Sequence, residues 1–266
     1  MKQRLRRTIP KEKLFVVKSN TKKIDFNKKF KFIYFDWWFQ IVSVLFFCCC
    51  WPLAGLCALY FGLRVTNFPG RKFLRRQGCI TVSNHCHYFD TVFASWVLLP
   101  HRLYISVAQQ NFEVPVIRRI LRLLRCFPIP KIPNKFDLIV GPIGEALSRG
   151  YHVHFLPEGD LVYLSQEIYR FKSGAFRMAY LHQAPVLPMV YVLKRRSIFG
   201  KEQSPHWPRI WLIYGEPLFP PPLSEDGILP IEKIHGMMDK VADWMEDTIA
   251  LYQRKTLQTT SGGPVG

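Results

Sequence analysis

The stretch CITVSNHCHYFD (residues 79–90) decides the fold, because an apolar run passes directly into a turn that carries a histidine and a carboxylate. The run at 79–82 predicts a buried strand, and residues 90–99 predict the helix that follows it. A turn between the two would bring Asp90 back beneath His85, where it hydrogen-bonds one imidazole nitrogen and leaves the other free. That is the layout of a general base directed at a hydroxyl. With 8 histidines in the chain the pair alone is a weak signal.

Composition limits the classes of protein that this chain can represent. Its 266 residues suit one globular domain with extensions, and hydrophobic and aromatic contents of 48% and 15% exclude a disordered protein. Lys and Arg total 37 against 19 Asp and Glu, a formal charge of +18. The surface should therefore attract an anionic partner, which leaves nucleic acid, acidic lipid and acidic small molecules as candidates.

A long apolar segment near the N-terminus favours the membrane among these partners. No charged residue occurs from Trp37 to Leu63, a stretch long enough to cross a bilayer as one helix. Pro52 and Gly55 interrupt it, and basic residues flank it on both sides, so a single span would place one basic flank on the wrong face. We favour a re-entrant or monotopic hairpin of two short helices in one leaflet, with a single span and a buried core helix as alternatives. The expected interfacial anchors are Tyr34, Trp37, Trp38, Trp51 and Tyr60.

After residue 76 strands alternate with helices. The predicted strands are 80–83, 102–108, 151–156, 186–193 and 210–214, and the predicted helices are 90–99, 116–126, 136–148, 174–182 and 231–251. Ser173 is expected to cap the helix that begins at Gly174. The pattern predicts an α/β fold with a mixed, mostly parallel sheet flanked by helices, and with its chemistry at the carboxyl ends of the strands. His85 and Glu158 both fall just past such ends, which argues for one shared site.

Four blocks stand in order along this domain, and together they are more specific than any one of them. They are Asn84-His85 with Asp90, Pro128-Ile129-Pro130-Lys131, Pro157-Glu158-Gly159 followed by FKSGAF (residues 171–176), and Ala184-Pro185-Val186-Leu187-Pro188. The arrangement resembles the glycerolipid acyltransferases, in particular the 1-acylglycerol-3-phosphate acyltransferases. The resemblance covers residues 61–191 and implies the fold of that family, with a membrane-embedded helical hairpin before it.

The resemblance also implies roles for individual residues. His85 would be the general base that deprotonates the acceptor hydroxyl, with Asp90 orienting it, which suits the chemistry because an alcohol is a poor nucleophile at neutral pH. Backbone N–H groups at the start of the helix near Asp90 would stabilise the oxyanion. The family's Phe-Ile-Asp-Arg block aligns with residues 128–131, and its Pro-Glu-Gly-Thr-Arg block ends here in Asp160 and Leu161, so the arginine that helps to hold the acceptor phosphate is missing. The expected substrate-binding residues are Asn84, Lys131, Glu158, Gly159, Arg170 and Lys172, the last two as replacements for that arginine.

By this resemblance the chain divides into a basic arm (1–36), a membrane-embedded helical segment (37–63), an acyltransferase domain (64–255) and a disordered tail (256–266). The expected activity is transfer of a fatty acyl chain from acyl-CoA or acyl carrier protein to a lysophosphatidic acid or related lysolipid. We expect no cofactor beyond that co-substrate, no metal, an anionic membrane surface as partner, and no nucleic acid. The expected location is the cytoplasmic face of a membrane, such as a bacterial inner membrane.

Three alternatives remain open at this point. Cys86 lies inside the His-to-Asp segment and would serve as a nucleophile if its setting activated it, whereas the other cysteines are expected to be reduced apolar fillers. His152 and His154 alternate on a predicted strand and, with His85, His87 and Asp90, would build the metal site of a hydrolase. The third alternative is a membrane adaptor that keeps the fold without catalysis.

Overall fold

A computed structural model of the chain describes residues 6–10, 23–26, 30–198, 201–202, 204–225 and 227–261. The strands are β1 (Arg64–Thr66), β2 (Ile80–Val82), β3 (Leu103–Ala108), β4 (Cys126–Ile129), β5 (His152–Phe155), β6 (Val186–Lys194), β7 (Ser197–Ile198), β8 (Lys201–Glu202) and β9 (Arg209–Tyr214). The helices are α1 (Trp37–Tyr60), α2 (Arg71–Arg76), α3 (Asp90–Leu98), α4 (Gln109–Phe112), α5 (Pro115–Leu123), the 3-10 helix η3 (Pro133–Ile139), α6 (Val140–Ser148), α7 (Gly174–Leu181) and α8 (Ile231–Ser261).

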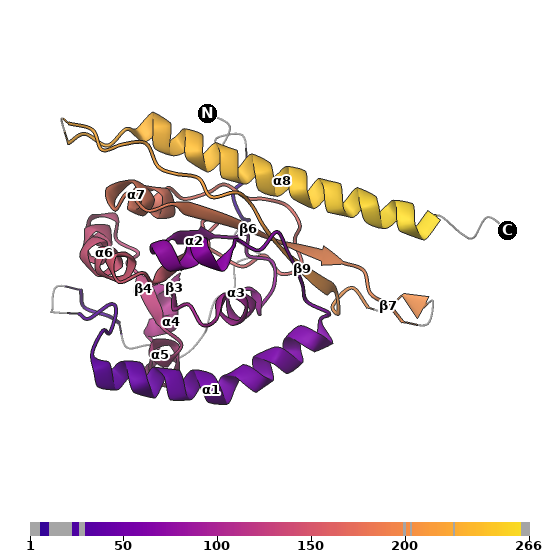
Figure 1. Ribbon diagram of the computed structural model, residues 1–266, viewed down its shortest axis with the longest axis horizontal. Coiled ribbons are helices and arrows are strands. Elements are labelled where there is room, and N and C mark those ends of the chain that lie inside the picture. Colours follow the sequence, from indigo (N-terminus) through magenta and orange to yellow (C-terminus); the bar gives the residue numbers. More distant parts are fainter. Residues whose placement is uncertain are drawn as a thin grey trace.

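A seven-stranded sheet forms the centre of the molecule, with the strand order β1-β9-β6-β2-β5-β3-β4 (Figure 1). The five strands from β6 to β4 are parallel to one another, whereas β9 pairs antiparallel with β6, and β1 runs parallel with β9. Short β7 and β8 form a separate ribbon. The predicted mixed, mostly parallel sheet is confirmed, and the carboxyl ends of β2, β5 and β6 meet at one edge.

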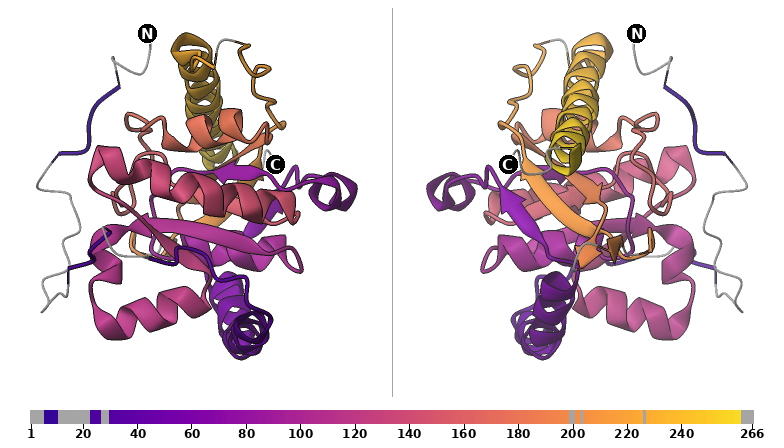
Figure 2. Two further views of the ribbon diagram at one scale, coloured as in Figure 1. Left: turned by 90° about the vertical axis from the view of Figure 1, so that its left-hand side faces the viewer. Right: turned by 90° about the vertical axis from the view of Figure 1, so that its right-hand side faces the viewer.

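Helices cover both faces of the sheet, and each face has its own apolar core (Figure 2). One core combines β-strand side chains such as Ile80 and Val82 with residues of α6, α7 and α8. The other combines Cys79 and Leu187 with residues of α3 and the end of α1. Neighbouring residues of β2 therefore point into different cores, as the two-residue period of a strand requires. This double burial explains the apolar residues of β2, and its one polar side chain, Thr81, is buried with its hydroxyl 2.9 Å from His154 Nδ1.

The apolar segment forms one helix of 24 residues, α1, so the predicted two-helix hairpin is wrong. Pro52 lies inside this helix, where a proline removes one backbone hydrogen bond and bends a helix without reversing the chain. Gly55 faces the indole of Trp96 on α3, and a methyl group at Gly55 would sit 3.7 Å from that ring. That distance is an ordinary van der Waals contact, so the packing of α1 on α3 would also accept an alanine here. Helix α1 contacts α3 and α5 and runs along the base of the molecule (Figure 1).

Helix α5 ends at Leu123, earlier than predicted, and strand β4 follows at Cys126 although the sequence pattern did not predict it. Arg125 stops the helix because its φ of 58° lies in the left-handed region. Pro128 lies within β4 and cannot donate to a sheet ladder, which disguises the strand in the sequence. The strand tolerates the proline because β4 is the edge strand of the sheet.

Three smaller differences concern the ends of elements. Ser173 occupies the residue before α7 but makes no side-chain capping bond, so that prediction is wrong. Helix α8 continues to Ser261, which makes residues 256–261 helical where we expected a tail, and residues 262–266 lie outside the described part. Phe32 and Ile33 of the basic arm are buried in the core, so the end of the arm is part of the domain.

Candidate active site

His85 and Asp90 lie at the carboxyl edge of the sheet, between the end of β2 and the start of α3. Asp90 is the first residue of α3, so the intervening turn folds its side chain back towards His85. His85 Nδ1 lies 3.1 Å from Asp90 Oδ2. The Asp90 side chain is fully buried, whereas the His85 side chain keeps 20% of its surface exposed. The pair therefore has the predicted geometry, with an anchored nitrogen and an imidazole that remains open to a ligand.

One oxygen of Asp90 organises the whole turn. Besides facing His85, Asp90 Oδ2 accepts hydrogen bonds from the backbone N–H of Cys86 at 2.8 Å and of His87 at 2.9 Å. The Asp90 N–H donates to the His87 carbonyl at 3.2 Å, and the Phe89 N–H donates to His87 Nδ1 at 3.3 Å. These four backbone donors are engaged within the turn. The expectation that N–H groups here stabilise an oxyanion is therefore wrong for them, because closing the turn uses them.

Glu158 connects a second loop to the turn between His85 and Asp90. Its Oε2 accepts from the His85 N–H at 3.0 Å, and its Oε1 accepts from the Tyr169 N–H at 2.9 Å. Burial raises the pKa of Glu158 to about 8, and the two backbone bonds oppose that rise. The loop also donates from Val162 N to the His85 carbonyl at 3.2 Å. Glu158 thus fixes the backbone of His85, and both of its oxygens are bonded to protein rather than to a ligand.

Asn84 ties the same turn to strand β6. Its Nδ2 donates to the Tyr191 carbonyl at 3.1 Å, and its Oδ1 accepts from the Tyr191 N–H at 2.8 Å. The Tyr191 hydroxyl donates in turn to the Asp90 carbonyl at 2.6 Å. Asn84 is buried, so this side chain acts on the backbone of β6. The sequence offered no signal for Tyr191, because its partners lie far away in the chain and meet it only through the pairing of β2 with β6.

The remaining predicted binding residues surround this centre at different distances. Gly159, with a φ of 90°, lies beside Lys172, whose ammonium would be 2.2 Å from a methyl group placed on the glycine. The exposed residue Arg170 donates its backbone N–H to the Arg7 carbonyl at 3.0 Å. Exposed Lys131 follows β4, which stands three strand spacings, or about 14 Å, from β2. The structure therefore groups Gly159 and Lys172 with the turn and sets Lys131 apart.

Aromatic side chains line one flank of the turn. The His87 ring lies 4.8 Å from that of Phe61 and 5.7 Å from that of Tyr163, and Tyr163 stacks on Tyr88 at 4.7 Å. Phe61 directly follows α1, so the apolar helix ends beside the site. Tyr88 and Tyr163 are exposed. This flank was not predicted, because its members come from three separate segments.

The histidines and Cys86 do not form a second reactive centre. Burial lowers the pKa of His152 to about 4 and that of His154 to about 3, and His154 Nδ1 lies 2.9 Å from the Thr81 hydroxyl. Both are core residues bonded to the β2 region. Burial raises the pKa of the Cys86 thiol well above its usual range. Within the described ranges no group of three His, Cys, Asp or Glu residues is arranged to hold a metal ion.

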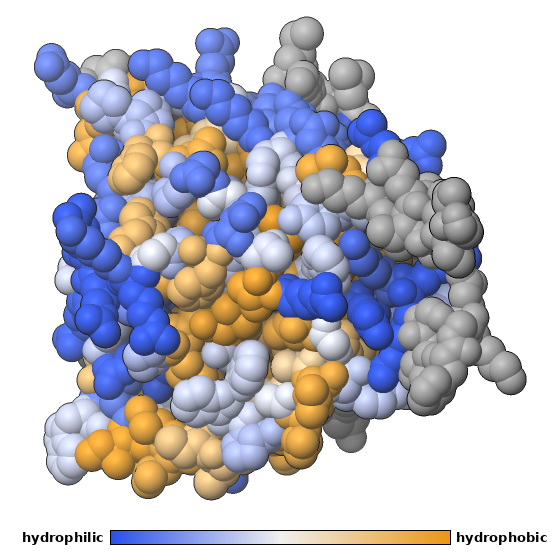
Figure 3. All heavy atoms as spheres, turned by 45° about the vertical axis from the view of Figure 1, so that its right-hand side comes forward, coloured by the Kyte–Doolittle hydropathy of each residue, from blue (hydrophilic) through white to orange (hydrophobic). Residues whose placement is uncertain are grey.

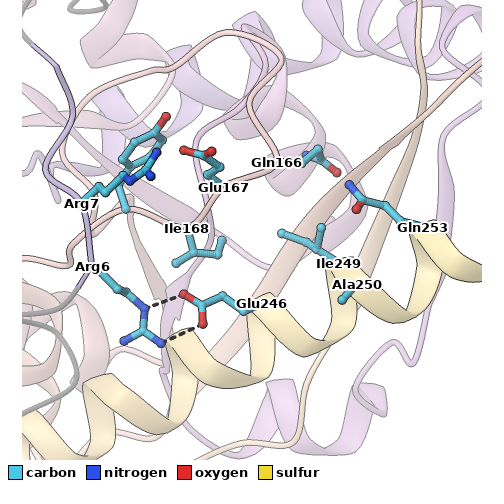
Figure 4. A pocket seen from close by; sticks show the side chains of 10 residues that line it. Arg6, Arg7, Gln166, Glu167, Ile168, Glu246, Ile249, Ala250 and Gln253 are labelled. Atoms are coloured by element: carbon cyan, nitrogen blue, oxygen red, sulfur yellow. Dashed lines mark hydrogen bonds and ion pairs between the residues drawn. The ribbon is translucent and has the colours of Figure 1, made fainter.

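A cavity of about 450 Å³ lies behind the Glu158 loop, between Arg6, Tyr169 and α8. Figure 4 shows Arg6 reaching across to Glu246, with Nε 2.6 Å from Oε1. Arg6 also contacts Asp243 at 2.5 Å and Asp239 at 3.6 Å. The N-terminal segment at residues 6–10 is thus held to α8 through Arg6 and, through the Arg7 carbonyl, supports the loop that carries Glu158.

Comparison with known proteins agrees with this geometry. The model of the Acyltransferase family matches residues 65–192. Seven chains of solved structures match, among them the 1-acyl-sn-glycerophosphate (LPA) acyltransferase PlsC from Thermotoga maritima, with 13% identity, coverage of 79% of each chain and a TM-score of 0.50. No curated protein sequence matches significantly. The structural likeness concerns the fold, whereas the family match spans His85, Asp90, Glu158 and Tyr191. Residues 65–192 therefore form an acyltransferase domain, and the protein is an acyltransferase enzyme.

Proposed function

We propose that this acyltransferase moves a fatty acyl chain from acyl-CoA or acyl carrier protein to a hydroxyl of lysophosphatidic acid or a related lysolipid at a membrane surface. The contact between His85 Nδ1 and Asp90 Oδ2 at 3.1 Å carries the proposal. Asp90 favours the tautomer with the proton on Nδ1, which leaves Nε2 as the base. The LPA acyltransferase fold supports a lysolipid acceptor.

The reaction proceeds by direct transfer. His85 Nε2 takes the proton from the acceptor hydroxyl while the hydroxyl oxygen attacks the thioester carbonyl carbon. The π electrons of the carbonyl group move to the carbonyl oxygen. When the carbonyl re-forms, the carbon–sulfur bond breaks and the thiolate leaves with the proton that His85 holds. The carboxylate of Asp90 stabilises the imidazolium in between. No acyl-enzyme is needed, and buried Cys86 supports this route because its thiol resists ionisation.

We further propose that α1 lies in the plane of one leaflet. By length and composition it is the one helix in the described ranges that is able to cross a membrane, and most of its side chains are exposed. Apolar side chains gather along the lower edge of the molecule, where α1 lies (Figure 3). A span perpendicular to the bilayer would submerge the domain that α1 contacts through α3 and α5. An in-plane helix instead brings Phe61, and with it the catalytic turn, to the membrane surface.

The catalytic proposal is tested by transfer of a labelled acyl group from acyl-CoA and from acyl carrier protein to a panel of lysolipids. Wild-type protein should acylate lysophosphatidic acid or a relative, and His85→Ala should lose about 10²- to 10⁴-fold in rate. His235→Ala, which removes an exposed histidine on α8, is the matched control and should retain full activity. Equal activity of wild type and His85→Ala would overturn the proposal.

The membrane proposal has a separate test in vesicle flotation. Leu53 and Leu56 are exposed on α1, whereas Leu251 is exposed on α8 across the sheet. A Leu53→Glu/Leu56→Glu protein should float with vesicles far less than wild type, because charge is expelled from the acyl region. Leu251→Glu should float normally. A double variant that still floats would show that α1 is not the membrane-binding element.

A further inference from the structure

Two arginines meet at the amino ends of the parallel strands, at the edge of the sheet opposite His85. Arg102 directly precedes β3, and Arg125 directly precedes β4. Tyr151 precedes β5, the strand beside β3, so it joins them. Parallel strands keep their amino ends together, and the catalytic turn lies beyond the carboxyl end of β2. This cluster is therefore separate from the active site.

Arg125 is a buried charge that lacks an acidic partner. Its side chain is 5% exposed, its Nε makes no hydrogen bond, and its guanidinium lies 4.6 Å from the ring of Phe47 on α1. Burial lowers its pKa, and the groups that act on it electrostatically are Tyr104, Arg102 and Tyr151, with no carboxylate among them. An unpaired buried charge costs several kcal/mol. A structure that keeps one has a use for it.

The backbone of Arg125 occupies the left-handed position that ends α5, so its conformation is explained by the fold. Its φ of 58° is unfavourable for a residue with a Cβ, at a cost of about 1–2 kcal/mol. Arg102 hydrogen-bonds the Tyr151 hydroxyl and lies 4.9 Å from that ring. A phenol is neutral and leaves the charge of Arg102 uncompensated. Two guanidinium groups held together in this way attract an anion.

A groove leads from Arg102 along the first turns of α1, whereas Arg125 is buried and is not part of the groove lining. The cavity has a volume of about 440 Å³, and its walls include Trp37, Ile41, Val44 and Leu45 of α1 together with Arg102 and Tyr151. Gln40 also lines it, and Gln40 Oε1 is a buried acceptor without a hydrogen-bond partner, which suits a hydroxyl group of a ligand and not the oxygens of an anion. Cationic and polar groups thus occupy one end, and an aliphatic and aromatic wall continues from them. Such a lining matches an anionic head with an apolar chain attached.

We propose that this groove binds one molecule of acidic phospholipid, with its phosphate on Arg102, the charge of buried Arg125 nearby, and an acyl chain along α1. A free phosphate would leave the apolar wall exposed to water, whereas a lipid covers both parts. The wall consists of the exposed face of α1, which the proposed membrane docking places among the acyl chains. The lipid would hold the start of α1 at a defined depth in the membrane, while the end of α1 positions the edge of the sheet that carries His85. The site does not depend on the acyl-transfer reaction.

The test is lipid retention by full-length protein in detergent, measured by native mass spectrometry during titration with phosphatidylglycerol or with phosphatidylcholine. Wild type should retain one phosphatidylglycerol and should not retain phosphatidylcholine to the same degree. Arg102→Gln should weaken retention about 10- to 100-fold, and Arg125→Gln should weaken it less, because Arg125 acts through its charge and does not line the groove. Arg119→Gln is the matched control, because Arg119 is exposed on neighbouring α5 and lies outside the groove lining. His85→Ala should retain the lipid like wild type.

Several outcomes would overturn this inference. Equal retention by wild type and Arg102→Gln would do so, and so would loss of retention in His85→Ala, which would assign the lipid to the active site. Competition by millimolar inorganic phosphate as effective as that by lipid would reduce the feature to a phosphate site. Thermal melting of each variant verifies folding. If Arg125→Gln does not fold, Arg102→Gln decides alone, because Arg102 is less buried.

Discussion

Replacing Asp90 with asparagine separates the charge of this residue from its role in the turn. Oδ2 receives the Cys86 and His87 N–H groups and faces His85, whereas Oδ1 is buried with no hydrogen-bond partner. An asparagine can put its oxygen at the Oδ2 position and accept the same bonds. Its NH₂ would then occupy the unpartnered position, at a cost of about 1–3 kcal/mol in unfolding free energy. Asp90→Asn should therefore fold with the turn intact.

The loss of charge has a larger effect on catalysis. Across 3.1 Å two unit charges attract by about 5 kcal/mol at an effective dielectric constant of about 20, and His85 becomes positive only when it holds the acceptor's proton. That is nearly four factors of ten in rate. General-base catalysis as a whole contributes about 10²- to 10⁴-fold, so kcat should fall within that range. KM for the acceptor should change much less, because Asp90 is buried and does not touch the substrate.

The assay is steady-state acyl transfer by Asp90→Asn beside wild type, His85→Ala and Asp247→Asn, with melting measured for each protein. Asp247 is exposed on α8 and supplies the same chemical change away from the site. A fall in kcat of less than about tenfold in a folded Asp90→Asn protein would refute the reasoning, because general-base catalysis contributes more. If kcat of Asp90→Asn falls as far as kcat of His85→Ala, His85 does not act as a base when the Asp90 carboxylate is absent.

Three further predictions follow from single contacts. Cys86→Ala should retain acyl transfer within a few-fold of wild type. A folded but inactive Cys86→Ala protein would instead support the alternative in which Cys86 is the nucleophile. Burial raises the pKa of Glu158 to about 8 in the folded protein, above its ordinary 4.5, so between these pH values only the folded state keeps the proton. The unfolding free energy should then fall as pH rises from about 4.5 to about 8, by at most about 1.4 kcal/mol per pH unit. The melting temperature of Glu158→Gln should depend less on pH than that of wild type, and parallel plots of melting temperature against pH would contradict this. Arg6→Ala should lower the unfolding free energy in urea titrations by about 1–3 kcal/mol, because Arg6 bonds Asp243 and Glu246. Arg6→Lys should give an unfolding free energy between those of wild type and Arg6→Ala. An unchanged urea midpoint in Arg6→Ala would show that these ion pairs do not stabilise the fold.

Local sequence determined the turn between His85 and Asp90 and the elements around it. His85 and Asp90 lie in one short segment between a buried strand and a helix, so their contact follows from the turn itself, and the apolar and polar periods placed most strands and helices correctly. The order of the four blocks also predicted the family, which the match over residues 65–192 confirms. The turn and the secondary structure need only neighbouring residues, and the family prediction needs only the order of the blocks along the chain.

Tertiary structure decided which distant groups meet. Glu158 reaches the His85 backbone only because β5 pairs with β2, and Asn84 reaches Tyr191 only because β6 pairs with β2 on its other side. Strand β4 was hidden by a proline that only an edge strand tolerates, and α1 stays one helix because it packs along the domain. Short-range periodicity carries no information on strand order or on which surface a helix covers. Those follow from burying two apolar faces at once, a property of the whole chain.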